Sequence, residues 1–124
     1  MSTPLSHDRP DALTNLRDQL RLFATERNWD QFHSPKNLVM ALTVEAAELL
    51  ETFQWLTEEQ SGSLPPETLS AARKEMADVL LYLIRLADKL DINLIDAAEM
   101  KLLENAQKYP VDKARGSSKK YTQF

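Results

Sequence analysis

Four segments of the chain repeat apolar residues at the three- and four-residue spacing of amphipathic helices. In the first of them the repeat consists of Leu13, Leu16, Leu20 and Phe23. The whole chain of 124 residues contains only two glycines, which leaves long stretches without a helix breaker. We therefore expect an all-α protein with helices at about 11–27, 35–56, 66–90 and 93–108.

Capping residues and prolines mark the ends of these expected helices. Ser34 and Pro35 have the residue types of an N-cap and a first helical position. Pro66 begins the third helix, Asn93 is the expected N-cap of the fourth, and Pro110 ends it. The break between the second and third helices is predicted at 57–65, which contains Gly62 and two serines.

Short links between four helices predict a four-helix bundle. The length suits one domain, so we expect a single domain over 1–124 with irregular tails at about 1–10 and 111–124. The second tail is polar and basic. Long leucine-rich helices are hard to cover within so few residues, so we also expect a homo-oligomer.

Composition removes several classes of function. There is no cysteine, so disulfides, thiolate nucleophiles and zinc–cysteine sites are excluded. Two glycines cannot build a phosphate-binding glycine loop, and a net charge of −4 does not favour nucleic-acid binding. The first residues lack the basic and apolar regions of a signal peptide, and no apolar run is long enough to cross a membrane. We expect a cytoplasmic protein with no nucleic-acid or membrane partner.

Two pairs of carboxylates lie at three-residue spacing on the two central helices. They are Glu45 with Glu48, and Glu75 with Asp78. On an ideal helix Glu45 points within about 60° of Leu38, Leu42 and Leu49, which places it inside a leucine stripe. Glu75 lies within about 40° of Leu86 and Val79, so it too enters an apolar face. Glu48 and Asp78 lie at the edges of these faces.

A carboxylate on an apolar face is costly unless it is neutralised or paired. Neither pair has a lysine or arginine within it, although Arg73, Lys74 and Arg85 lie nearby in the sequence. A divalent cation would relieve the repulsion, and ligands that are all oxygen favour Mg²⁺, with Mn²⁺ as a substitute. The alternative is that these are ordinary solvated helix faces.

Aromatic residues occur close to the acidic helices. Trp29 and His33 precede the second helix, Trp55 stands at its end, and Tyr82 lies one turn beyond Asp78. Such rings could stack on a nucleobase. Core packing is the alternative for the aromatic rings, and capping of the second helix is the alternative for His33.

Basic and amide side chains follow in the last helix and the tail. Lys101 and Asn105 share one helical face and, with Lys108, could contact phosphate oxygens. The tail adds Lys113, Arg115, Lys119 and Lys120. The alternative is that these cations are only solvated.

The acidic pattern Glu45-x-x-Glu48 followed by Glu75-x-x-Asp78 resembles the metal motif of the MazG-like all-α nucleoside triphosphate pyrophosphatases. The resemblance covers about 16–121 and is strongest to the dCTP pyrophosphatase branch. It rests also on Trp29-x-x-Phe-His33, Phe53-Gln-Trp55, Lys101-x-x-x-Asn105, and the run from Tyr109-Pro-Val to Arg115-Gly-Ser-Ser-Lys-Lys-Tyr121.

This resemblance implies a function and a set of roles. Family members cleave the α–β bond of a nucleoside triphosphate, give a monophosphate and pyrophosphate, cleanse the nucleotide pool, and form dimers or tetramers. The four carboxylates would bind Mg²⁺. From the chemistry of phosphoanhydride hydrolysis we expect them to carry the catalysis, with Glu48 as the proton acceptor. Lys101 and Asn105 would hold the triphosphate, and the residues enclosing the base would be Trp29, His33, Trp55 and Tyr82.

One departure from the branch concerns the base. Animal dCTP pyrophosphatases align a histidine with Leu20, so the preference for cytosine is less secure here. Two other functions remain open from the sequence. One is a non-catalytic helical module that senses nucleotides or binds a partner, and the other is a dUTPase-like enzyme with a different base preference.

Overall fold

The computed structural model describes residues 11–124, and these are helical and turn residues without a strand. Residues 1–10, where an irregular tail is predicted, lie outside the described part. The all-α prediction is confirmed. The helices in chain order are α1 (Ala12–Glu26), η2 (Asp30–Phe32), α2 (Pro35–Phe53), α3 (Glu58–Ser61), α4 (Pro66–Lys89), α5 (Leu94–Lys108), α6 (Val111–Ala114) and η3 (Tyr121–Gln123).

Side-chain caps fix the starts of α2 and α5. The Ser34 hydroxyl accepts a hydrogen bond from the Asn37 N–H at 3.1 Å, and Pro35 follows as the first helical residue. The Asn93 side chain accepts from the Asp96 N–H at 3.0 Å at the start of α5. Both predicted caps are confirmed.

Helix α1 ends through a residue in the left-handed region. Asn28, just past the C-cap Arg27, has φ of 55°, a conformation that asparagine tolerates better than most residues. This turn leads the chain into η2 and brings Trp29 back toward α1. The backbone N–H of Trp29 donates to the Ala24 carbonyl at 2.9 Å. The turn therefore places an aromatic ring beside α1.

The structure differs from the expected elements in three places. Helix α2 ends at Phe53 rather than near Leu56. Thr57 and Gln60 form a reciprocal capping box that starts the short helix α3 inside the predicted break. Pro110 both ends α5 and caps α6, so the tail at 111–124 carries α6 and η3 instead of being irregular.

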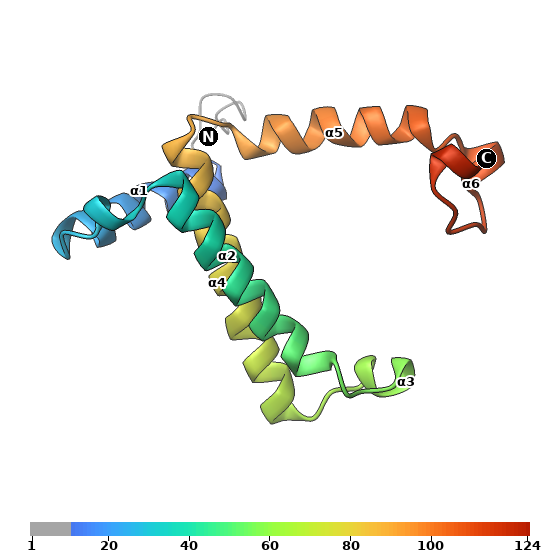
Figure 1. Cartoon of the computed structure of the whole chain (residues 1–124), viewed down its shortest axis with the longest axis horizontal. Helices are drawn as coiled ribbons and strands as arrows, with labels where there is room; N and C mark the ends of the chain where they lie inside the picture. Colours follow the sequence, from blue (N-terminus) through green and yellow to red (C-terminus); the bar gives the residue numbers. More distant parts are fainter. Residues whose placement is uncertain (1–10) are drawn as a thin grey trace, which may run out of the picture. The chain divides into compact units, whose positions relative to one another are not determined.

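The chain divides into two compact units, Met1–Asp91 and Ile92–Phe124. In the first, α2 and α4 pack along each other over much of their length and α1 packs against α4 (Figure 1). Three of the four predicted long helices thus share this unit, and α5 belongs to the second. The single-domain prediction stays a prediction.

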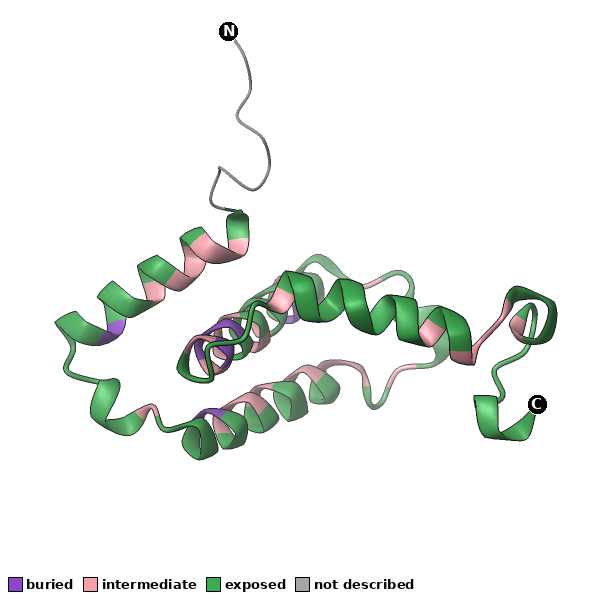
Figure 2. Ribbon diagram, turned by 90° about the horizontal axis from the view of Figure 1, so that it is seen from above, coloured by how far each residue is buried: buried purple, intermediate pink, exposed green. Residues whose placement is uncertain are grey.

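The core of the first unit is small. Its buried apolar residues in the described part are Ala24, Leu38, Ala72, Ile84 and Ala87. Most of α2 and α4 is partly or fully exposed, as the colouring of Figure 2 shows. No helix among residues 11–124 is long and apolar enough to span a membrane.

Candidate active site

Three of the four predicted carboxylates meet between α2 and α4. Glu45 and Glu48 of α2 and Glu75 of α4 each offer one oxygen, and these oxygens lie within 4.8 Å of one another. Glu45 and Glu75 are half-buried and Glu48 is exposed, as the helical spacing predicts. Oε2 of Glu45 and Oε2 of Glu75 are buried and have no hydrogen-bond partner. Two orphaned buried acceptors on facing helices indicate a site for a positively charged ligand.

Electrostatic repulsion within this cluster shows in the proton affinity of Glu45. The facing Glu75 carboxyl, burial, and the neighbouring Glu48 and Asp78 carboxylates raise the pKa of Glu45 to about 7. Without a cation, the cluster thus retains a proton near neutral pH. The cluster therefore carries more negative charge than its surroundings compensate.

The donor set fits a hard divalent cation. All the converging atoms are carboxylate oxygens, and within residues 11–124 no lysine or arginine forms an ion pair with them. A bound cation would satisfy the two orphaned oxygens and remove the repulsion. Asp78 lies one helical turn from Glu75 on α4, outside the trio, and its charge acts on Glu45.

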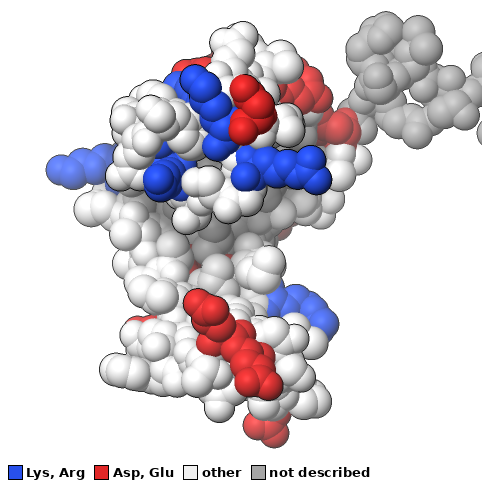
Figure 3. Space-filling model, turned by 90° about the vertical axis from the view of Figure 1, so that its right-hand side faces the viewer, with Lys and Arg blue, Asp and Glu red and all other residues white. Residues whose placement is uncertain are grey.

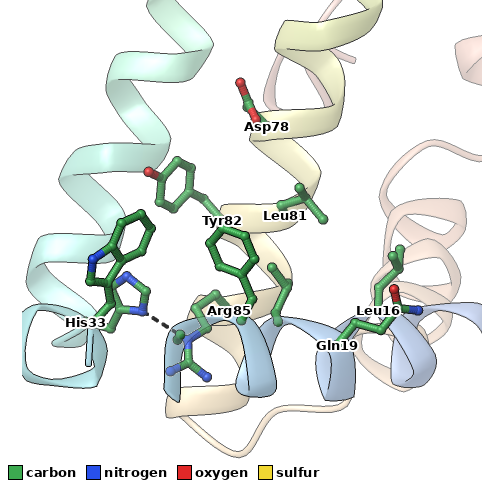
Figure 4. Close-up of a pocket in the computed structure, with 11 residues that line it drawn as sticks. Leu16, Gln19, His33, Asp78, Leu81, Tyr82 and Arg85 are labelled. Carbon is green, nitrogen blue, oxygen red and sulfur yellow. Dashed lines mark hydrogen bonds between the residues drawn. The ribbon is translucent and has the colours of Figure 1, made fainter. Parts of the chain in front are cut away.

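The first unit also contains a pocket of about 440 Å³, and Asp78 is the one of the four carboxylates that lines it. This volume is within the usual range for small-molecule sites. Figure 4 shows Asp78 and Tyr82 projecting from α4, with Leu16 and Gln19 coming from α1. The full lining is Leu16, Gln19, Leu20, Phe23, Ala24, Trp29, His33, Asp78, Leu81, Tyr82 and Arg85.

Aromatic rings form one wall of this pocket. Trp29 meets Phe23 edge-to-face with centroids 5.6 Å apart, and meets His33 at 6.3 Å in a similar geometry. Trp29 nevertheless stays 43% exposed, so its ring is not buried in the hydrophobic core. An exposed ring beside a pocket is available to stack on a planar ligand.

Arg85 is a pocket residue that the sequence analysis noted only as a nearby cation. It is 5% exposed, and its Nε donates to Nδ1 of His33 at 3.1 Å (Figure 4). Its guanidinium also pairs with Asp30 and with Asp88. Burial, followed by the Arg85 charge, lowers the pKa of His33. Arg85 lies with Ile84 and Ala87 on the buried side of α4, which its local sequence does not indicate.

Other predicted site residues are not brought to the pocket. Trp55 follows the end of α2, is 87% exposed and is absent from the lining. Lys101 and Asn105 lie on α5 in the second unit, where Lys101 pairs with Glu104 at 3.4 Å. Their roles in phosphate binding stay predictions.

The second unit has a small aromatic cluster of its own. Tyr109 meets Tyr121 and Phe124 edge-to-face at 5.9 and 5.7 Å. Lys108 lies over the Tyr121 ring at 5.1 Å. These contacts fold the tail back onto the end of α5. Basic side chains stand out in the upper part of Figure 3, and those of this unit are Lys101, Lys108, Lys113, Arg115, Lys119 and Lys120.

Comparison of the sequence with known proteins identifies relatives of this chain. The sequence pattern of the MazG-like family matches residues 40–124. The chain is 40% identical over 121 residues to mouse dCTP pyrophosphatase 1, covering 96% of this chain and 71% of that protein. It is 44% identical over 104 residues to human dCTP pyrophosphatase 1, covering 82% of this chain and 61% of that protein.

A solved structure supports the same grouping. The crystal structure of a pyrophosphatase from Archaeoglobus fulgidus superposes with a TM-score of 0.77 at 36% sequence identity. The match covers 89% of this chain and 98% of the archaeal one. Sequence pattern, relatives and fold agree, and the chain belongs to the MazG-like family.

Proposed function

We propose that this protein is a divalent-metal-dependent pyrophosphatase that hydrolyses the α–β bond of a nucleoside triphosphate, giving the monophosphate and pyrophosphate. The observation that carries the proposal is the pair of orphaned, buried carboxylate oxygens of Glu45 and Glu75, together with a pocket of about 440 Å³ whose lining includes Asp78. Relatives named dCTP pyrophosphatase 1 support dCTP or a modified dCTP as the substrate. Removal of such nucleotides from the cellular pool is the corresponding role.

The pocket suits the base and the carboxylates suit the phosphates. Trp29 would stack on the base, with Tyr82 and His33 at its edge. Asp78 lines the pocket and interacts electrostatically with Glu45, so it stands between the two regions. A nucleotide with its base among the rings would therefore direct its phosphates toward the acidic cluster.

Glu45, Glu48, Glu75 and Asp78 are the residues that would hold the metal, and we assign Mg²⁺ with Mn²⁺ as a substitute. When bound, such an ion would neutralise phosphate charge and acidify the attacking water. Glu48 is the exposed member of the trio, and we assign it to accept the proton of that water. A bond forms between the water oxygen and the α-phosphorus, and the bond to the bridging oxygen breaks. Pyrophosphate carries that oxygen away.

The rest of the triphosphate needs cations. Lys101 and Asn105, which match the family's Lys-x-x-x-Asn pattern, would bind the β- and γ-phosphates, and basic residues of 108–120 would assist. Trp55 is 87% exposed, so a role in enclosing the base would need a further part of the protein to cover it.

Incubation with a panel of nucleoside triphosphates and Mg²⁺ tests the function directly. We expect pyrophosphate, not orthophosphate, with the highest kcat/KM for dCTP or a 5-substituted dCTP. No pyrophosphate with any nucleotide would instead indicate a non-catalytic module. Hydrolysis of a diphosphate as readily as the triphosphate would indicate a dUTPase-like enzyme.

We also propose that the protein is a homo-oligomer. Helices α2 and α4 leave many large apolar side chains exposed in a single chain, among them Val39, Met40, Val44, Leu50, Leu69 and Met76. Association would bury this surface, as in obligate oligomers. Light scattering at micromolar concentration should give the mass of a dimer or tetramer, and Val44→Glu should shift it toward the monomer. A monomeric mass for the unmodified chain would rule the oligomer out.

A further inference from the structure

Arg85 lies in the wall of the pocket, away from the carboxylate cluster, and its charge is almost fully enclosed. A buried guanidinium persists only when its charge and its donors are matched. Here Asp30 of η2 and Asp88 of α4 pair with it. This leaves Nε, and Nε donates to the ring of His33 at 3.1 Å.

The carboxylates of Asp30 and Asp88 also accept hydrogen bonds from two further cations. Arg21 of α1 donates to Asp88 from Nε at 2.8 Å. Lys89 of α4 donates to Asp30 at 3.0 Å. The network thus joins α1, η2 and α4 around one guanidinium and leaves Arg85 little freedom to turn. Such a fixed side chain can set the state of the group it contacts.

The contact determines where the proton of His33 is carried. Arginine has only N–H donors and stays protonated, so Nδ1 of His33 must be the acceptor. In the neutral ring the remaining proton is then on Nε2. Burial and the charges of Arg85 and Lys89 lower the pKa of the ring and outweigh the opposing charge of Asp30. His33 is therefore neutral at pH 7 and presents one N–H donor.

We propose that Arg85 is a positioning residue for base recognition: it holds His33 in the Nε2–H form, so that the pocket offers a fixed donor to an acceptor on the base edge. The proposal rests on the nucleotide pocket of the proposed function. It adds that the pocket recognises a hydrogen-bond acceptor, rather than a donor, on the base edge. Cytosine has two adjacent acceptors, N3 and O2, that suit such a donor. Uracil and thymine replace the first of them with an N–H donor.

The protonation state of His33 can be read on the whole protein without nucleotide. Long-range ¹H–¹⁵N spectra of the imidazoles distinguish the two tautomers, and a His7→Asn variant assigns the signals because the chain has only two histidines. We expect His33 to be the Nε2–H tautomer at pH 7, and to become a mixture in Arg85→Met. The Nδ1–H tautomer in the unmodified protein would overturn the proposal, and this measurement needs no variant of Arg85 to fold.

Steady-state kinetics test whether Arg85 acts through His33. One lost hydrogen bond corresponds to about a tenfold rise in KM for dCTP, with kcat changed less than about twofold, in Arg85→Met and in His33→Ala. The double variant should show no further rise, because the two residues share one interaction. Additive effects would overturn the proposal.

Arg21→Met is the matched control for a merely structural role. It removes a cation from the same network at Asp88 but leaves the contact with His33 in place. We expect lower thermal stability with an unchanged KM. An equal rise in KM for Arg21→Met and Arg85→Met would show that only the stability of the network matters.

Binding of a nucleotide analogue separates this proposal from the proposed function. Added α,β-methylene dCTP with Mg²⁺ should shift the His33 Nε2 resonance, and an unmoved resonance would overturn the proposal even where turnover is normal. The proposed function fails differently, through the absence of pyrophosphate from every triphosphate.

Discussion

Pyrophosphate release should fall by at least about a hundredfold when Glu45 or Asp78 is changed to alanine, since losing a metal ligand costs more than the roughly 10–100-fold of a lost outer-shell contact. Glu45 contributes an oxygen that converges with those of Glu48 and Glu75. Asp78 lines the pocket and influences Glu45. Each change should also raise the Mg²⁺ concentration needed for half-maximal rate. Both quantities can be measured by coupling pyrophosphate release to a colorimetric assay across a Mg²⁺ titration.

Glu51→Ala is the control for this prediction. It removes an exposed carboxylate from the same helix but from outside the cluster, so the rate should stay within about twofold of the original. Circular dichroism should show that all three variants keep their helices. Unchanged turnover in Glu45→Ala or Asp78→Ala would contradict the proposed site.

In the absence of metal, the protein should lose stability as the pH rises through neutrality. The folded-state pKa of Glu45, about 7, lies above its ordinary value of 4.5. The folded state therefore binds the proton more tightly than the unfolded chain does. The resulting stabilisation is complete below about pH 4.5 and is lost as the pH passes through 7. Allowing for screening at the exposed side of the cluster, we expect a loss of about 1–2 kcal/mol.

Urea unfolding in EDTA at pH 5 and pH 8 measures this effect. Glu45→Gln should unfold at a higher urea concentration than the unmodified chain at pH 8 and at a similar one at pH 5. His33 acts in the opposite direction, because its pKa is lowered and its contribution is lost as the pH falls. The difference between the two chains cancels that contribution. Equal urea midpoints for Glu45→Gln and the unmodified chain at pH 8 would show that the charge of Glu45 does not destabilise the folded state.

Added Mg²⁺ should reverse the loss of stability at high pH. At pH 8 it should stabilise the unmodified chain, because a ligand that binds only the folded state shifts unfolding by mass action. In Glu45→Gln the gain should be much smaller. Glu51→Gln should respond like the unmodified chain. Equal gains in all three would place the metal elsewhere.

Local features of the fold were predictable because they depend on neighbouring residues. Ser34-Pro35 and Asn93 fix helix starts within one turn, and both caps were found as expected. The half-buried position of Glu45 followed from its angle to the leucines of its own helix. The capping box of Thr57 and Gln60 was also local, but it fell in a segment rich in breakers and was not anticipated.

The pocket could not be predicted in the same way. The contact of Arg85 with His33 joins residues 52 positions apart, and nothing in either local sequence indicates it. The pocket needs α1 to pack on α4, so Leu16, Gln19 and Leu20 entered it only with the tertiary structure. Trp55 shows the converse case, since its position next to a motif gave no information about its exposure.

The residues of α1 that face the pocket have a consequence for which nucleotides it can tell apart. Leu16, Leu20 and Phe23 present only carbon atoms there. An alkyl group on a bound ring would meet these carbons without disturbing any hydrogen bond. One methyl group is worth at most about 0.8 kcal/mol in such surroundings, or about fourfold in affinity. The pocket would thus tolerate a methyl group on the pyrimidine rather than strongly select for it.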